Sequence, residues 1–134
     1  MVIDYSNGEA VFSTNFNIHD HIFNSMRFDY REKNIYIEIT ASGSSNQKYT
    51  IEFRNVIGFE MISCDFWGKS PHILSFEFIK SSDYRLIKTL LEEEKNNNYF
   101  CSNLSKNKTY IETVLVFTSG DRLTIACEHI SKTD

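Results

Sequence analysis

Residues 26–39 read MRFDYREKNIYIEI, and this stretch decides the fold of the chain. Apolar and polar side chains alternate on both sides of a short polar connection, Arg31 to Asn34. Successive side chains of a β-strand point to opposite faces, so this alternation is typical of a half-buried strand. Two such runs joined by a short polar segment predict an antiparallel hairpin, which extends from Ile22 to Thr40.

The same pattern recurs after a polar, glycine-containing loop. Residues 49–53 alternate again and predict a third strand. Apolar residues continue as far as Ile62, but Asn55 and Gly58 interrupt the alternation. An interruption of this kind predicts that the strand continues as a bent or bulged extension.

Two further strand regions follow in the second half of the chain. Residues 73–79 alternate, and Leu74, Phe76 and Phe78 are predicted to face one way. Residues 110–127 form two alternating runs around a Ser-Gly-Asp turn. This arrangement predicts a second antiparallel hairpin.

One helix is predicted near residues 82–95. Apolar residues recur there at helical spacing, and the helix-capping residue types Ser81, Ser82 and Asp83 come just before them. A strand over Tyr84–Leu91 is the alternative, because short apolar runs fit either structure.

The summed pattern predicts a mainly β (α+β) fold, either an antiparallel twisted sheet or a two-layer β-sandwich built from hairpins, with one covering helix. A chain of 134 residues has the usual size of one domain, so a single domain over residues 1–134 is expected. The terminal regions have weaker patterns. A short edge strand is expected at Ala10–Ser13 and a frayed tail at Ser131–Asp134.

Composition narrows the function classes. The net charge is -4 and the basic residues are dispersed, which argues against nucleic-acid binding, because such binding depends on clustered positive charge. The three cysteines form no C-x-x-C pair, which argues against a disulfide scaffold or a zinc ribbon. No run of apolar residues is long enough for a membrane span and no leader is evident, so the cytoplasm is the expected location.

No catalytic motif emerges, so the chain is expected to be neither an enzyme nor a cofactor protein. The most notable polar cluster contains His19 and His21, which would share a face if both lay on a strand. A metal site would need further ligands, such as His72, His129 or a carboxylate. The favoured interpretation is that His19 and Asp20 start a strand, and a small-molecule or metal pocket near His19 and His21 is the alternative.

A partner-binding site is predicted at Asp65, Phe66 and Trp67, with Tyr36 as an extension on an outward strand face. Loop aromatics beside acidic groups are residue types that anchor protein interfaces. The alternative is that Phe66 and Trp67 fold back and cap the open end of the sheet. A third interpretation is a homodimer that forms by pairing of an apolar strand edge with itself.

Several short segments together carry a resemblance to a known group. They are His19-Asp20-x-Ile22, Met26-x-Phe28-Asp29, Ile35-x-Ile37-x-Ile39, Ile51-x-Phe53-x-Asn55-Val56 and the turn Thr118-Ser119-Gly120-Asp121. In these segments the chain resembles a broad group of small bacterial β-rich proteins, some of which are counted among the immunity proteins of polymorphic toxin systems. The resemblance implies a cytoplasmic, non-enzymatic protein that binds and neutralises a cognate toxin.

Overall fold

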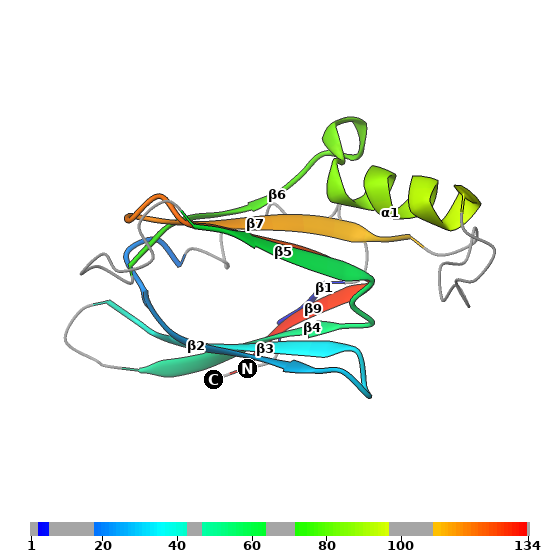
Figure 1. Ribbon diagram of the computed structural model, residues 1–134. Helices are drawn as coiled ribbons and strands as arrows, with labels where there is room; N and C mark the ends of the chain where they lie inside the picture. Colours follow the sequence, from blue (N-terminus) through cyan, green and yellow to red (C-terminus); the bar gives the residue numbers. More distant parts are fainter. Residues whose placement is uncertain (1–2, 6–17, 43–46, 64–71, 97–108, 134) are drawn as a thin grey trace.

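Two antiparallel sheets face each other as the layers of a β-sandwich, and one helix lies on the outer side of the smaller sheet (Figure 1). The computed structural model describes residues 3–5, 18–42, 47–63, 72–96 and 109–133. The predicted mainly β fold with one helix is therefore confirmed, and the sandwich is the correct one of the two proposed forms.

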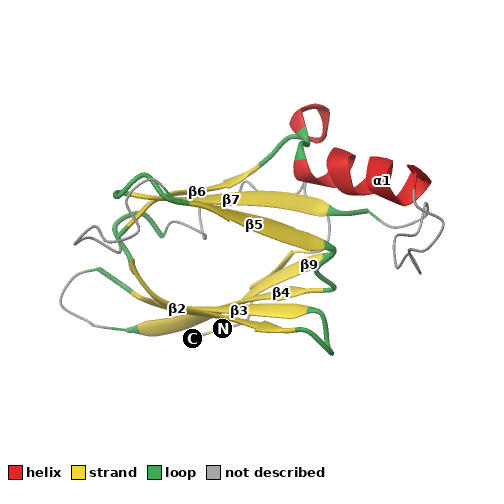
Figure 2. Cartoon of the chain, viewed as in Figure 1, coloured by secondary structure: helices red, strands yellow, loops and turns green. Residues whose placement is uncertain are grey.

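Along the chain, β1 to β4 form most of the larger sheet, β5 to β8 form the smaller sheet together with α1 on its outer side, and β9 returns to the larger sheet (Figure 2). Their bounds are β1 Ile3–Tyr5, β2 Ile22–Asp29, β3 Asn34–Thr40, β4 Lys48–Arg54, β5 Gly58–Ile62, β6 Ile73–Phe78, α1 Leu86–Asn96, β7 Ile111–Phe117, β8 Arg122–Cys127 and β9 His129–Thr133. The five-stranded sheet has the order β1-β9-β4-β3-β2, and the four-stranded sheet has the order β5-β8-β7-β6.

The core fills the space between the sheets with the apolar side chains that the alternation assigned to one face. Fully buried members include Ile35, Ile37, Ile39, Ile51, Phe53, Ile111, Leu115, Leu123, Ile125 and Ile130. Burying each such side chain contributes about 1.5–3 kcal/mol, so this layer dominates the stability of the fold. The predicted hairpin is formed by β2 and β3, in which Met26 lies opposite Ile37 and Phe28 opposite Ile35.

The predicted extension of β4 changes sheets instead of continuing in its own. Asn55 adopts a left-handed conformation with φ 53°, and β5 then pairs with β8 in the other sheet. The return crossing lies alongside, where Glu128 links β8 to β9. The Glu128 amide donates to the Arg54 carbonyl over 3.1 Å, and the Asn55 side-chain amide donates to the Glu128 carboxylate. The pairs β4–β9 and β5–β8 are therefore one ribbon that bends from sheet to sheet.

Two strand predictions are wrong in detail. Residues 131–133 of the tail expected at Ser131–Asp134 are instead part of β9, which lies between β1 and β4 and buries Ser131, and Asp134 lies outside the described residues. Backbone pairing on both sides holds this segment in place although it contains only one large apolar residue. Leu74 does not share a face with Phe76, because a register shift between Ile73 and Ser75 turns Leu74 outward and Ile73 into the core.

At the amino-terminal end, the structure adds β1, which the sequence pattern did not predict. The edge strand expected at Ala10–Ser13 lies outside the described residues.

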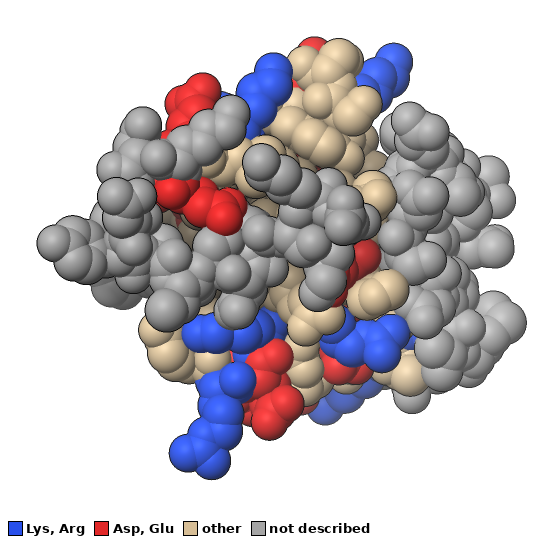
Figure 3. Space-filling view, turned by 90° about the vertical axis from the view of Figure 1, so that its right-hand side faces the viewer, with Lys and Arg blue, Asp and Glu red and all other residues tan. Residues whose placement is uncertain are grey.

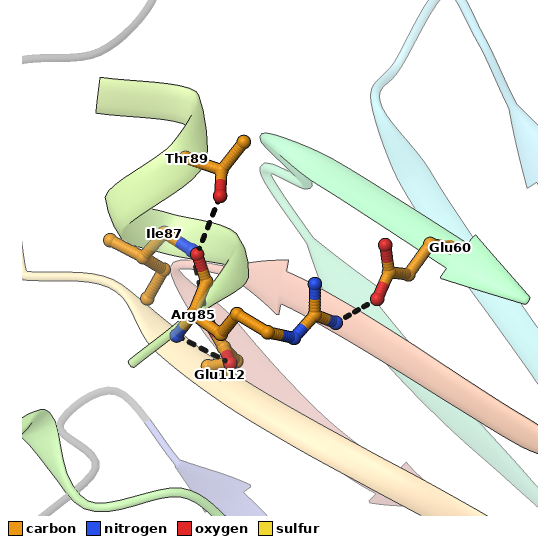
Figure 4. Close-up of polar contacts among 5 residues, drawn as sticks. All are labelled: Glu60, Arg85, Ile87, Thr89 and Glu112. Carbon is orange, nitrogen blue, oxygen red and sulfur yellow. Dashed lines mark hydrogen bonds and ion pairs between the residues drawn. The ribbon is translucent and has the colours of Figure 1, made fainter. Parts of the chain in front are cut away.

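Helix α1 is capped from the neighbouring sheet and not by its own preceding residues. The predicted cap, Ser81–Asp83, forms a separate 3-10 turn. The Glu112 carboxylate on β7 accepts hydrogen bonds from the Arg85 amide over 3.1 Å and from the Ile87 amide over 2.9 Å (Figure 4). A carboxylate at this position satisfies helix-terminal donors and complements the helix dipole. The strand alternative for Tyr84–Leu91 is thereby excluded.

Candidate partner-binding surface

Of the four predicted partner-binding residues, the structure describes one. Asp65, Phe66 and Trp67 lie outside the described residues. Tyr36 lies on β3 and belongs to the outer face of the five-stranded sheet, as its position in the alternation predicted. Its ring is half-buried, and the Asn34 side-chain amide donates to its hydroxyl oxygen over 3.3 Å.

A cation covers the Tyr36 ring. The Arg27 guanidinium carbon lies 4.3 Å from the ring centroid, which is within the range of a cation–π interaction. The two residues are direct neighbours across β2 and β3. Arg27 also lies 3.8 Å from the Asp29 carboxylate, and its side chain is largely exposed. The pair therefore has a defined geometry and is still accessible from solvent.

Strand register places Tyr36 inside a polar row that crosses the sheet. Arg27 lies opposite Tyr36, Tyr36 lies opposite Glu52, and Glu52 lies opposite Ser131. Adjacent positions on this face hold further polar residues, namely Ser25, Asp29, Asn34, Glu38, Thr40, Lys48, Thr50, Arg54, His129 and Thr133. No described element covers this side of the five-stranded sheet (Figure 1). It is a polar surface on which Tyr36 is the one aromatic residue among the described strand positions.

Charges of both signs are mixed on the described surface. Figure 3 shows basic and acidic side chains next to one another on the lower, five-stranded side of one end of the sandwich. Nucleic-acid binding favours a continuous basic stripe, because each phosphate contact replaces a counterion. A mixed surface of this kind fits recognition of another protein better.

The two histidines of the predicted metal alternative do not converge. His19 lies in a turn before β2, where Asp20 has a left-handed φ of 64°, and the His19 Nδ1 atom lies 3.1 Å from the Asp20 carboxylate. His21 instead stacks on Tyr49, with ring centroids 6.2 Å apart. Within the described ranges, no group of three or more metal-ligating residues comes together. His19 therefore lies in a turn, so the two imidazoles are not placed on one strand face.

His21 has a perturbed acid–base equilibrium. Burial lowers the pKa of His21 from 6.5, and the positive charges of Lys132 and His19 lower it further. The backbone interaction with His19 and the charge of Asp20 act in the opposite direction. A group whose pKa is lower in the folded state contributes its stability above the unfolded pKa and loses it as the pH falls.

We therefore expect the free energy of unfolding to decrease as the pH falls below 6.5, and His21→Gln to remove part of this decrease. Denaturant titrations between about pH 8 and about pH 5.5 measure the effect. His72→Gln is the matched control, because it replaces a histidine that is not among the groups acting on the pKa of His21. Identical pH profiles for the wild type and His21→Gln would contradict the assignment.

Cys127 is the one cysteine among the described residues. It faces the core between Ala126 and Glu128 and is fully buried. Burial strongly raises the pKa of its thiol, so the thiolate needed for nucleophilic attack is disfavoured. Cys127 therefore acts as a small apolar core residue, as the strand pattern predicted.

A second exposed surface follows the edge strand β5, which the sequence did not identify. Phe59 and Met61 are 37% and 42% exposed, although they lie on the face of β5 that points toward the other sheet. Phe59 meets Phe28 of β2 edge to face, with ring centroids 5.0 Å apart. Gly58 and Asn55 interrupt the strand pattern just before this surface, but they do not indicate its exposure.

No family model matches this chain, and no curated protein is significantly similar to it. In the part of the chain that the structure describes, no helix is both long and apolar enough to span a membrane.

Proposed function

We propose that this chain is a non-catalytic protein-binding domain and that its partner docks on the outer face of the five-stranded sheet. The observation that carries the proposal is the Arg27–Tyr36 pair, a cation stacked on an aromatic ring toward the β2 edge of an uncovered sheet face. Tyrosine and arginine are the residue types most enriched among interface hot spots. Their mutual stacking restricts both side chains before binding, which lowers the entropy lost on association.

The charge of the chain indicates the kind of partner. The net charge is -4, and acidic Glu38 and Glu52 flank Tyr36 on the same face. A basic partner would be attracted over a distance and would find carboxylates at the rim of the contact. Asp65, Phe66 and Trp67 remain predicted contributors to this interaction.

The proposed biological role is that of an immunity or accessory protein acting in the cytoplasm. The sequence resemblance to immunity proteins of polymorphic toxin systems supports this role, and a sandwich with a rigid exposed face suits the covering of a toxin surface. Co-expression with the protein encoded by the neighbouring gene tests it. Restored growth of cells that produce a toxic neighbour would support the role, and unchanged toxicity would oppose it.

Tyr36→Ala is expected to weaken partner binding by about 2 kcal/mol, which is roughly a 30-fold increase in Kd. The reason is that both the ring and the ordered position of Arg27 are lost together. The measurement is isothermal titration calorimetry with the partner identified by affinity capture on the wild-type protein.

The matched control is Tyr30→Ala. Tyr30 also carries a cation over its ring, with Lys33 Nζ 3.6 Å from the centroid, but it lies in the hairpin turn and not on the sheet face. We expect this variant to bind like the wild type. Equal affinities for the wild type, Tyr36→Ala and Tyr30→Ala would rule out the outer face of the five-stranded sheet as the binding surface.

A further inference from the structure

The four edge strands of the sandwich differ in how well they are protected against pairing with another chain. An exposed edge carries unpaired backbone groups, and proteins normally block it with short length, charges or bulges. β1 is only three residues long. β2 and β6 each contain a register shift, and they carry exposed charged residues, Arg27 and Glu77.

β5 is less well protected than these three edges, although it is short and carries one charged residue. Its pairing with β8 runs from Gly58 to Ile62 without a register shift, and among the described strands β8 is its one neighbour. Phe59, Met61 and Ile62 are all exposed. The single charged residue of the strand, Glu60, already forms an ion pair with Arg85 (Figure 4).

We propose that β5 pairs in antiparallel fashion with β5 of a second copy of this chain, with Glu60 at the two-fold axis. This register places Gly58 opposite Ile62 and Phe59 opposite Met61, and each pair occurs twice. Phe59 and Met61 are on one face of the strand, so the exposed ring of each copy covers the exposed thioether of the other. Contacts of this kind are the unit of sheet stabilisation.

The other face of the strand is also complementary to itself. Ile62 would lie opposite Gly58 of the second copy, where a side chain is missing. Leu90 of α1 occupies that space, since its Cδ1 atom lies 2.7 Å from the position that a Gly58 Cβ would take. Ile62, which is 51% exposed in a single copy, would therefore pack on Leu90 of the second copy.

The charged groups near the two-fold axis, Glu60 and Arg85, are also compatible with the antiparallel pairing of two β5 strands. Two Glu60 carboxylates directly opposite each other would repel. Each of them, however, is paired with an exposed Arg85 side chain that lies at the same edge. Two carboxylates and two guanidinium groups then alternate around the axis, so their charges balance without any outside partner. This self-complementarity favours a second copy over a different protein as the occupant.

Light scattering after size exclusion tests the proposal with two lysine variants. We expect the wild type to be a dimer, and Ile62→Lys to raise the dimer dissociation constant by at least about tenfold, because it places a charge in the contact. Leu74→Lys is the matched control, since Leu74 is 47% exposed on β6, the opposite edge of the same sheet, and should leave the dimer intact. A monomeric wild type, or an unchanged Ile62→Lys dimer, would overturn the proposal.

Disulfide trapping tests the register, in a background with Cys64→Ser and Cys101→Ser. Residues directly opposite in an antiparallel pair have Cα atoms about 4.5–5.5 Å apart, within the range of a disulfide. Glu60→Cys should therefore form a covalent dimer on oxidation. Ile62→Cys should not, because its copies would be about 14 Å apart along the strands. Cross-linking through residue 62 but not residue 60 would overturn the proposal. Tyr36→Ala should leave the dimer intact, which separates this result from the partner-binding proposal.

Discussion

Replacing Glu112 by alanine is expected to lower the free energy of unfolding by about 3 kcal/mol. Its carboxylate is 2% exposed and accepts two backbone hydrogen bonds at the start of α1, from Arg85 and Ile87. Removing it leaves the buried Ile87 amide and the part-buried Arg85 amide without this acceptor, and the desolvation cost of these donors then opposes folding. Urea denaturation followed by circular dichroism measures the change.

Two variants separate the hydrogen bonds from a general effect of charge. Glu112→Gln keeps one carbonyl oxygen as acceptor, so we expect about half of the loss seen for alanine. Glu77→Ala removes an exposed carboxylate from the neighbouring strand β6 and should change stability by no more than about 0.5 kcal/mol.

Hydrogen exchange then shows which elements lose stability in Glu112→Ala. We expect the amides of α1, Leu86–Asn96, to lose protection in Glu112→Ala, while those of β3 and β4 keep theirs. If Glu112→Ala lowers the free energy of unfolding no more than Glu77→Ala does, the two hydrogen bonds contribute nothing to the docking of the helix.

Phe53→Ala is expected to cost about 4 kcal/mol, the largest effect of any substitution proposed for this protein. Phe53 is fully buried on β4, lies between Ile35 and Ile130 in the register, and has its ring centroid 6.3 Å from that of Phe76. The substitution removes the transfer free energy of the ring and leaves a cavity between the two sheets.

Two further variants show whether the loss of stability comes from the volume of a core side chain. Phe53→Leu keeps most of the volume and should cost only about 1.5 kcal/mol. Tyr36→Ala, on the outer face of the adjacent strand, should cost about 1 kcal/mol or less, because its ring is not part of the core. Denaturation midpoints of the three variants in parallel provide the measurement, and equal losses for Phe53→Ala and Tyr36→Ala would contradict the assignment of faces.

The sequence was sufficient to predict those elements whose own side chains repeat with a clear period. In β3, Ile35, Ile37 and Ile39 are all fully buried and their intervening neighbours face outward, as alternation requires. Tyr36 could be assigned to the outer face by the same rule. The helix was also predicted, because Leu86 and Ile87 bury one side of it against the outer face of the sheet.

The remaining features depend on contacts between distant residues. β9 has the sequence HISKT, and pairing with β1 and β4 holds it in place rather than any apolar period of its own. The cap of α1 comes from Glu112, which lies 25 residues after Ile87 and in another element. The exposure of β5 follows from strand order, which a single sequence does not encode locally. Its edge surface could not have been predicted for that reason.

The position of β9 has a consequence for folding during translation. β9 lies between β1 and β4, although it is synthesised after every other strand in the structure. The β2–β3–β4 hairpins can form as soon as they leave the ribosome, because their partners are close in sequence. β1, however, has no described strand to pair with until β9 is synthesised, because β9 is the strand that lies between β1 and β4. The larger layer is thus completed only after β9 has been synthesised, and until then one side of β4 has no strand paired with it.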